Sequence, residues 1–313
     1  MKAIGLSGGV DDYSTARVSV SAVGGSPLAE VYTAASECGQ GIVGVQIQIA
    51  QTELGIAEVV VPPADTGIGD AGSSSASRQT WMTGGAVQGA CRAVRAELLE
   101  RAARMLGVGQ LRLSLAEGAV FVDDAEDPAV SLVDVLGDES VEAEFEYHHR
   151  PTEPIDDELG QGNAHPAFAY AAHRAVVDVD RDLGLVRVVE LATVQDVGKA
   201  MNPQAVEGQI EGGSAQGLGL ALLEELQIVD GVIKNPSFMD YLIPTILDMP
   251  PMSIRLFEFP HPDSPYGLNG VGEPPSLSST PAIVNALRDA TGLDLPRAPV
   301  RPADLIATMA TNS

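Results

Sequence analysis

The sequence DTGIGDAGSSSAS, residues 65–77, leads directly into a long helical pattern at residues 79–106. The first stretch consists almost entirely of Gly, Ser, Asp and Ala, which favour irregular backbone. In the second stretch Val87, Val94 and Leu98 follow one another at helical spacing, which predicts an α-helix. A loop that ends at a helix N-terminus presents unpaired N–H groups and the positive end of the helix dipole. The junction therefore favours a bound anion, above all a phosphate.

Two extended segments and a helix are expected before this loop. Residues 16–22 alternate in polarity, and residues 28–34 follow them after a turn at residues 24–27. Residues 40–54 carry apolar side chains near helical spacing, and residues 58–62 return to an extended, β-branched pattern. The predicted order is a hairpin, a helix and one more strand.

Further strands are expected after the long helix, at residues 111–115, 119–122 and 142–147. Residues 151–162 are rich in Pro, Asp, Glu and Gly, which is typical of an irregular connection. We place the boundary between two lobes there, with a first lobe at residues 1–150 and a second at residues 151–313.

The second lobe repeats the plan of the first. Residues 167–180 and 185–195 alternate like strands and are joined by a turn at Asp182-Leu183-Gly184, and residues 206–225 favour a helix. The glycine-rich residues 212–219 lie inside this helix, so they are not expected to form a nucleotide-binding loop. The pattern predicts an α+β fold of two related lobes of mixed sheet and helix, and not a Rossmann sheet.

The charge balance is strongly acidic. Among 313 residues, 43 are Asp or Glu and 18 are Lys or Arg, so the formal net charge is -25. Binding to nucleic acid depends on cationic side chains that displace counterions from phosphates, and anionic membranes attract the same side chains. The N-terminus also lacks the pattern of an export signal, and no apolar run is long enough to span a membrane. We expect neither nucleic acid nor membrane as a partner, and we expect a cytoplasmic protein.

Side chains that could bind a metal directly are not grouped in the sequence. Cys38 and Cys91 are far apart and form no CxxC pair, whereas iron–sulfur and zinc sites need several ligands at close spacing. His148 and His149 are adjacent in an expected strand, where neighbouring side chains point to opposite faces. Any redox metal is therefore expected to be held by another group and not by this chain's side chains.

Five groups of short motifs occur in a fixed order along the chain. They are Glu37-Cys38-Gly39-Gln40-Gly41; Asp65-Thr66 with Gly72-Ser73-Ser74-Ser75-Ala76-Ser77-Arg78; Asp196-Val197-Gly198 with Asn202-Pro203; Gly208-Gln209 with Gln216-Gly217-Leu218-Gly219; and Gly270-Val271-Gly272-Glu273-Pro274-Pro275. In this order they resemble the C-terminal half of the molybdopterin-binding large subunit of the xanthine dehydrogenase/aldehyde oxidase family. Residues 148–152 (HHRPT) and 235–238 (NPSF) are most similar to bacterial xanthine dehydrogenases.

The resemblance implies a molybdenum–molybdopterin cofactor, in its mononucleotide or its cytosine dinucleotide form. The residues that it assigns to the cofactor are Gly39, Gln40, Gly41, Ser73, Ser74, Ser75, Ala76 and Gln209. The two Gln amides are expected to contact the pterin, and the Ser-rich loop to hold its phosphate through hydroxyl and N–H groups. The molybdenum is expected to be held through the pterin alone. A solvated loop, or a Gln that only bridges two backbone groups, stays open as the structural alternative.

Glu273 is the expected catalytic base. In the family that the chain resembles, a carboxylate takes the proton of the water-derived oxygen that attacks an electron-poor carbon. Gly272 allows a close approach of the backbone, and Pro274 with Pro275 stiffens the chain after the carboxylate. The alternative is an ordinary loop acid that caps a helix beginning near Ser278.

The function implied by the resemblance is hydroxylation of a purine such as xanthine or hypoxanthine, as in purine catabolism. Oxidation of an aldehyde or of another N-heterocycle is the alternative within the class, and a non-catalytic assembly protein is the alternative outside it. Activity is expected only in a heteromer, with the N-terminal half of the molybdenum subunit, an iron–sulfur subunit and an FAD subunit as partners.

Overall fold

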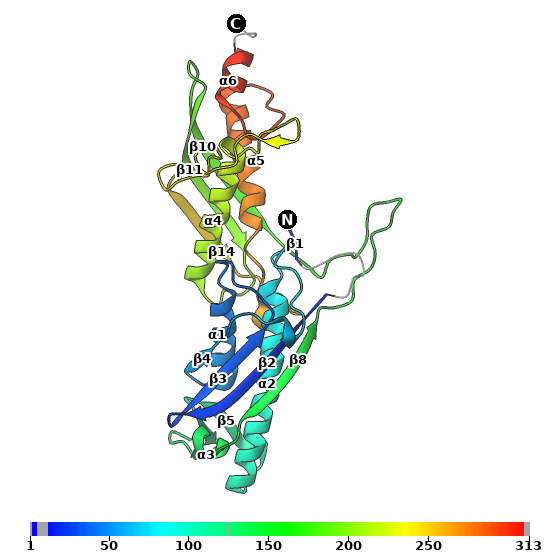
Figure 1. Cartoon of the computed structure of the whole chain (residues 1–313), viewed down its shortest axis with the longest axis vertical. Coiled ribbons are helices and arrows are strands. Elements are labelled where there is room, and N and C mark those ends of the chain that lie inside the picture. The colour runs from blue at the N-terminus through cyan, green and yellow to red at the C-terminus, as the bar shows by residue number, and fades with distance from the viewer. Residues whose placement is uncertain (1, 5–11, 124, 310–313) are drawn as a thin grey trace. The chain divides into compact units, whose positions relative to one another are not determined.

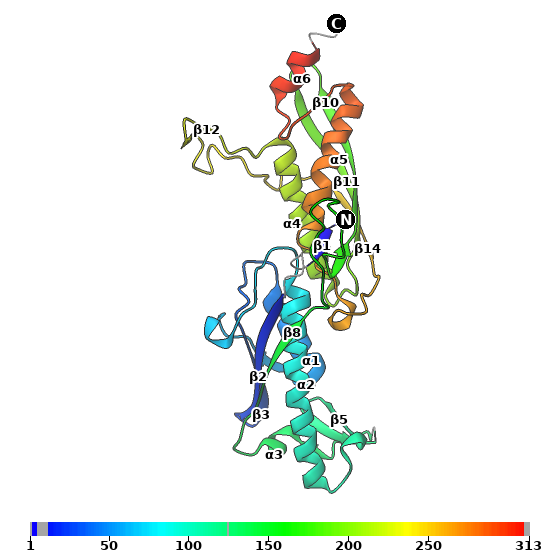
Figure 2. The same cartoon turned by 90° about the vertical axis from the view of Figure 1, so that its right-hand side faces the viewer.

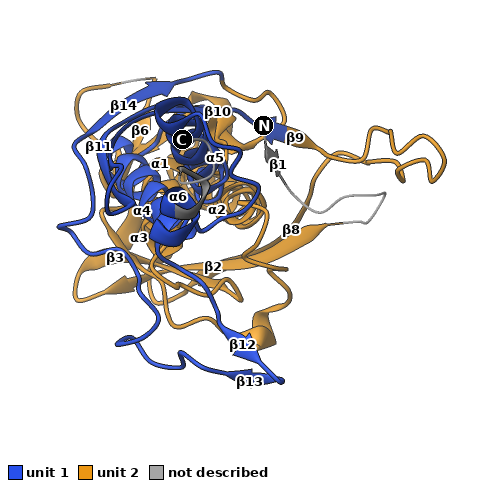
Figure 3. Cartoon of the chain, turned by 90° about the horizontal axis from the view of Figure 1, so that it is seen from above, with its two compact units in different colours: residues 1–2, 168–259, 271–313 blue, residues 3–167, 260–270 orange. Residues whose placement is uncertain are grey.

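The computed structural model describes residues 2–4, 12–123 and 125–309. The chain forms two compact units, coloured separately in Figure 3. Unit 2 comprises Ala3–Ala167 and Pro260–Gly270, and unit 1 comprises Met1–Lys2, Phe168–Phe259 and Val271–Ser313. The expected α+β class is confirmed, because mixed sheets and helices make up both units.

Unit 2 contains a four-stranded sheet in the order β4-β3-β2-β8 (Figure 1). Its strands are β2 (Tyr13–Val23), β3 (Ser26–Thr33), β4 (Glu58–Val60) and β8 (Val141–His148), and its long helices are α1 (Ile42–Leu54) and α2 (Gln79–Leu106). The β2–β3 and β2–β8 pairs are antiparallel, and β3–β4 is parallel. Alternate residues Ala16, Val18 and Val20 are fully buried, because one face of the sheet is covered by α2.

Two glycines let α2 approach β8 closely. A Cβ atom on Gly85 would lie 2.6 Å from the ring of Tyr147, and one on Gly89 would lie 2.2 Å from the ring of Phe145. Real Cβ atoms do not come this close, so any larger residue at either position would push the helix off the sheet.

The other elements of unit 2 are short. They are η1 (Thr66–Ile68), η2 (Gln110–Arg112), β5 (Leu113–Ala116), β6 (Ala119–Val122), β7 (Val130–Ser131), α3 (Leu132–Leu136) and η3 (Pro265–Gly267). The strands β5, β6 and β7 form a separate antiparallel sheet. Two further short strands are β1 (Lys2–Ile4) and β9 (Ala167–Ala169).

Unit 1 contains a three-stranded sheet in the order β10-β11-β14. Its elements are β10 (Ala171–Asp180), β11 (Leu185–Asp196), α4 (Pro203–Leu222), β12 (Ile228–Val229), β13 (Val232–Ile233), β14 (Met252–Phe257), α5 (Pro274–Thr291) and α6 (Pro302–Met309). Figure 2 shows α4 and α5 side by side against this sheet. Leu191, Leu218, Ile283 and Leu287 are almost completely buried between these layers and form the core of the unit.

The two units share one sequence of elements. Unit 2 runs β2-β3-α1-β4-α2, and unit 1 runs β10-β11-α4-β14-α5. In each unit the first two strands form an antiparallel hairpin, and the third strand is parallel to the second. The hairpin followed by a helix, which the sequence predicts twice, is thus present in both units.

The units do not divide the chain at residue 150, where the sequence places the boundary. Residues 151–167 remain with unit 2, and the chain returns to unit 2 at Pro260–Gly270. A partly buried contact holds this segment to unit 2: Tyr266 donates a hydrogen bond to Glu53 Oε1 at 2.5 Å, 213 residues away in sequence. Local patterns carry no signal for such a pairing.

Several element ends also differ from the sequence expectation. The helix expected at residues 206–225 is α4, which begins at Pro203 because Asn202 accepts a hydrogen bond from Ala205 N and Pro suits the first helical turn. The single strand expected at residues 167–180 is interrupted at Tyr170, between β9 and β10. Among the described residues, no helix is both long and apolar enough to cross a membrane.

Candidate cofactor site

The Ser-rich loop in unit 2 is built around a buried arginine. Arg78 has no exposed side-chain surface, and its guanidinium donates to both carboxylate oxygens of Asp12 at 2.6 and 2.7 Å. The same guanidinium donates to the carbonyl oxygens of Ala71 at 2.5 Å and Ser73 at 2.8 Å. A bidentate ion pair of this kind is among the stronger polar contacts in proteins. It holds the loop that precedes α2 in one conformation.

The carbonyl groups of Ala71 and Ser73 point toward the buried Arg78, so the N–H groups of the residues that follow them point away from it. Gln79 Nε2 also donates to the Ser73 carbonyl, at 3.1 Å. Because the C=O and N–H of a trans peptide point in opposite directions, the N–H of Ser74 points away from Arg78.

Gly72 also shapes this loop. Its φ is +62°, and a Cβ atom there would lie 2.7 Å from Arg78 Nη1, so the position requires Gly.

The outward side of the loop offers hydrogen-bond donors. Its exposed residues include Ser73, Ser74 and Ser75. Ala76 and Ser77 have positive φ values of 62° and 48°, and Arg78 then has φ -94° and ψ -21°. When left-handed and right-handed helical backbone conformations follow one another, the N–H groups of successive residues turn to one side and form a concavity that can bind an anion. The N-terminus of the 28-residue α2 has no side-chain cap, and a helix start of this kind favours a phosphate. Within the loop, Ser75 N already donates to Ser73 Oγ at 3.0 Å.

The Gln40 loop precedes α1. Gly39 and Gly41 have φ values of 102° and 82°, which favour Gly, and a Cβ atom on either would meet nothing within 4 Å. Gln40 is half-buried, donates to Ser36 O at 2.8 Å and accepts from Cys38 N at 2.6 Å. Its amide keeps one further N–H and one lone pair for a ligand.

Glu37 organises this loop, a role that sequence reasoning missed. Its carboxylate accepts from Gly39 N at 2.8 Å, Gly41 N at 2.9 Å and Val43 N at 3.1 Å. Desolvation opposes its ionisation, but these backbone hydrogen bonds outweigh that effect and lower the pKa of Glu37. The start of α1 is therefore already occupied by a carboxylate, unlike the start of α2.

The two loops lie together in unit 2. Ala35, Ile42 and Ala71 form one buried apolar cluster, which joins the segment around Gln40 to the segment before Ser73. The structure thus joins the chain directly after Gly41 to the chain two residues before Ser73.

A later segment of unit 2 packs on the same loop. A Cβ atom on Gly270 would lie 1.7 Å from Ser77 O, so only Gly fits there. Asn269, directly before it, is 6% exposed, and its Oδ1 has no hydrogen-bond partner among the described residues. An unsatisfied buried acceptor costs about 1–3 kcal/mol. A ligand that carries N–H donors would satisfy it.

Glu273 lies in unit 1, at the start of α5. It is half-buried with φ -90° and ψ -33°, and its side chain makes no capping hydrogen bond. Its carbonyl oxygen accepts from Ser276 Oγ at 3.0 Å. The helix begins at Pro274 and not near Ser278, so the alternative of a side-chain cap for a later helix is wrong.

The start of α5 is pressed against α4. A Cβ atom on Gly213 would lie 2.9 Å from Pro275 Cβ and 3.2 Å from Gly272 O. One on Gly217 would lie 1.8 Å from Ser279 Oγ. Gly213 and Gly217 therefore allow close packing of α4 on α5. Gln209 is half-buried and precedes Gly213 by four residues, so it lies on the same face of α4.

Other candidate groups have local partners. His148 Nε2 lies 2.9 Å from Glu146 Oε1, and Arg112 donates to Asp123 Oδ1 at 2.9 Å. Among the described residues, no group of three or more His, Cys, Asp or Glu side chains is arranged to hold a metal ion.

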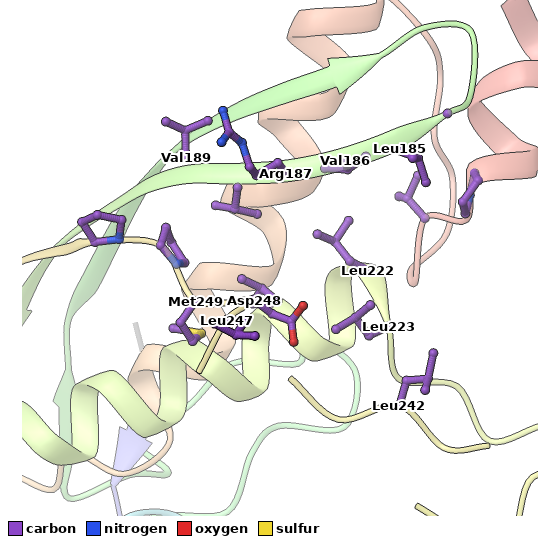
Figure 4. Close-up of a pocket in the computed structure, with 17 residues that line it drawn as sticks. Leu185, Val186, Arg187, Val189, Leu222, Leu223, Leu242, Leu247, Asp248 and Met249 are labelled. Atoms are coloured by element: carbon purple, nitrogen blue, oxygen red, sulfur yellow. The ribbon is translucent and has the colours of Figure 1, made fainter. Parts of the chain in front are cut away.

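A cavity of about 570 Å³ in unit 1 is separate from the predicted residues (Figure 4). It is lined mainly by apolar side chains, including Leu222, Leu223, Leu247 and Met249. None of the residues assigned to the cofactor lines it, so it adds nothing to the candidate site.

Comparison with known proteins identifies the family. A family model described as the molybdopterin cofactor-binding domain matches residues 1–250. The chain belongs to this family. The resemblance predicted from the five motif groups is thus confirmed.

Two relatives of this chain carry the names of xanthine dehydrogenase subunits. The putative xanthine dehydrogenase molybdenum-binding subunit of Escherichia coli (strain K12) is 32% identical over 286 residues, which cover 88% of this chain and 37% of the relative. A probable xanthine dehydrogenase subunit of Bacillus subtilis (strain 168) is 34% identical over 274 residues, which cover 86% of this chain and 36% of the relative. The chain thus spans little more than a third of their length.

A solved structure is also similar. Quinoline 2-oxidoreductase from Pseudomonas putida 86 has a TM-score of 0.77 and 27% identity, covering 95% of this chain and 38% of the other. The residues of this chain fit a molybdopterin cofactor on three observations. The start of α2 has no side-chain cap, the Gln40 loop leaves open space around two glycines, and Asn269 holds an unsatisfied acceptor.

Proposed function

We propose that this chain forms part of a molybdenum hydroxylase that oxidises a purine such as xanthine or hypoxanthine, with Glu273 as the general base. The observation that carries the proposal is the position of Glu273, in a half-buried turn stiffened by two prolines and pressed against α4. A backbone turn held in one conformation suits a side chain that must lie at hydrogen-bond distance from a reacting atom.

The proposed roles of the chain's other residues follow from their geometry. Ser73, Ser74, Ser75 and Ala76 would hold the cofactor phosphate through hydroxyl and N–H groups. Gln40 and Gln209 would hydrogen-bond to the pterin, and Gly39 and Gly41 would let the backbone approach it. When bound, the cofactor would supply the electron-accepting centre and the oxygen nucleophile. Glu273 would act as the base that takes the proton from that oxygen.

The choice of a purine rests on the names of the relatives in Escherichia coli and Bacillus subtilis. The similarity to quinoline 2-oxidoreductase favours another N-heterocycle as the second candidate. Aldehyde oxidation and a non-catalytic assembly role remain the competing hypotheses. Assays with xanthine, hypoxanthine, quinoline and an aliphatic aldehyde on the purified complex would separate them.

The proposed complex contains the remaining part of the molybdenum subunit, an iron–sulfur subunit and an FAD subunit, in the cytoplasm. The cofactor would be the mononucleotide or the cytosine dinucleotide form. Purification from the host followed by metal analysis and mass spectrometry tests this composition. Recovery of the chain alone, without molybdenum, would contradict it.

The central test is Glu273→Gln in the purified complex. Gln keeps the size of the side chain but cannot take a proton, so turnover should fall by at least about a hundredfold. Molybdenum content should stay unchanged, because the proposed role of Glu273 is toward the substrate and not toward the pterin. Loss of molybdenum with unchanged activity per metal atom would instead make Glu273 a structural residue.

A further inference from the structure

His173 connects the two helices that meet at the Glu273 segment. It lies on β10 and is half-buried, with Nδ1 at 2.8 Å from Ser278 Oγ on α5 and Nε2 at 3.0 Å from Ser214 Oγ on α4. Ser278 lies 105 residues away along the chain. All these contacts are within unit 1, so they belong to one packed body.

The protons in this bridge can be assigned by counting donors. The Ser278 hydroxyl is placed to donate its single proton to the carbonyl oxygen of Pro274 at 3.1 Å, which leaves it to accept from His173. Thr193 Oγ1, 3.4 Å from Nδ1, donates to Ala172 O at 3.2 Å, so both neighbours favour a proton on Nδ1. Burial lowers the pKa of His173 to about 4, so the ring is neutral near pH 7 and Nε2 is bare. The Ser214 hydroxyl then donates to Nε2.

The bridge ends on the peptide group next to Glu273. From β10 the hydrogen bonds run through Ser278 to Pro274 O, and Ser276 Oγ donates to Glu273 O at 3.0 Å. The Glu273 carbonyl also accepts from Leu277 N at 3.3 Å, so the hydroxyls of Ser276 and Ser278 add to the backbone hydrogen bonds of this first turn. His173 contacts the Ser278 hydroxyl.

We infer that His173 is a positioning residue for Glu273, acting through its Nδ1–H and Ser278 to set the first turn of α5. This inference rests on the proposed role of Glu273 as the base. It also assigns unequal importance to the two ring nitrogens. The Nδ1 contact reaches the Glu273 turn, whereas the Nε2 contact reaches only α4.

A pair of substitutions separates the two contacts. In His173→Asn the amide nitrogen can take the place of Nδ1 and donate to Ser278, while in His173→Gln the longer amide takes the place of Nε2 and faces Ser214. Both remove the ring, so each controls for lost packing in the other. In the purified complex, His173→Gln should lower kcat by about tenfold to a hundredfold, with KM and molybdenum content unchanged. His173→Asn should retain kcat within about twofold.

Two further measurements make the test more specific. Ser278→Ala should lower kcat about as much as His173→Gln, and the double variant should be no worse than either, because both break one connection. Ser214→Ala should have little effect on kcat. Nitrogen-15 NMR of the imidazole should show a neutral ring protonated at Nδ1 near pH 7, independently of activity.

Equal losses in His173→Asn and His173→Gln, or a ring protonated at Nε2, would overturn the inference. Loss of molybdenum or of folded protein in both variants would likewise reduce His173 to a structural residue. The Glu273→Gln result is separate. If that variant loses turnover while the His173 pair is unchanged, the proposed base stands and only the positioning role fails.

Discussion

The starts of α2 and α5 occupy the same place in two units with the same order of elements, yet they are built in opposite ways. Before α2, a buried ion pair turns carbonyl groups inward, and the helix start has no side-chain cap. Before α5, two prolines remove the first donors, and glycines of α4 close over the turn. The first design suits an anion, and the second suits a fixed carboxylate.

The comparison shows how one fold supports two kinds of site. A helix N-terminus attracts negative charge in either case. At α2 the proposed contacts come from backbone N–H groups and Ser hydroxyls, so the loop sequence can be small and polar. At α5 the negative group belongs to the protein, as the side chain of Glu273, and the turn must hold it in place. The loop chemistry, not the fold, decides which of the two results.

Loss of the buried ion pair before α2 should have the greatest effect on stability. Arg78→Met leaves Asp12, 2% exposed, with a buried charge that has lost its bidentate partner, and such a loss costs about 3–5 kcal/mol. Urea unfolding should show this decrease, and molybdenum content should fall with it. Arg112→Met, which removes an exposed and solvent-screened ion pair with Asp123, should leave the free energy of unfolding nearly unchanged. Equal losses would mean that the buried pair does not hold the loop.

A smaller loss of stability should follow from disturbing the close packing at α5. Gly217→Ala would place a Cβ atom 1.8 Å from Ser279 Oγ, so α4 and α5 must separate, at a cost of about 1–3 kcal/mol. Gly208→Ala is the control on the same helix, because a Cβ atom there meets nothing within 4 Å. That change should stabilise the protein by about 0.5–1 kcal/mol. Thermal unfolding of both variants provides the measurement, and the same sign for both would contradict the close packing.

Ser74→Ala should change stability least. Ser74 is exposed, so the free energy of unfolding should change by no more than about 0.5 kcal/mol. Molybdenum occupancy should nevertheless fall, while activity per bound molybdenum stays constant, which is the reverse of Glu273→Gln. Ser140→Ala, an exposed serine outside the loop, is the control and should change neither quantity. Unchanged occupancy in Ser74→Ala would remove this hydroxyl from the proposed phosphate site.

Much of the local structure could be predicted from short patterns. The long helix was expected at residues 79–106 and is α2 with the same ends, because its apolar spacing and the preceding small residues are both local signals. The glycines of α4 could be placed inside a helix for the same reason. The ends of α4 and α5 were less well predicted, since capping by Asn202 and the start at Pro274 depend on single residues.

The amino-acid sequence was sufficient for the α+β class, the repeated hairpin and helix, the two polar loops and the family. These follow from periodicity, turn residues and motif order, which act over a few residues at a time. The folded structure was needed to show that Arg78 pairs with Asp12, that His173 meets Ser278, and that residues 260–270 return to unit 2. Such contacts join residues 66 to 213 positions apart, and burial and hydrogen bonding select them only once the sheets and helices have packed.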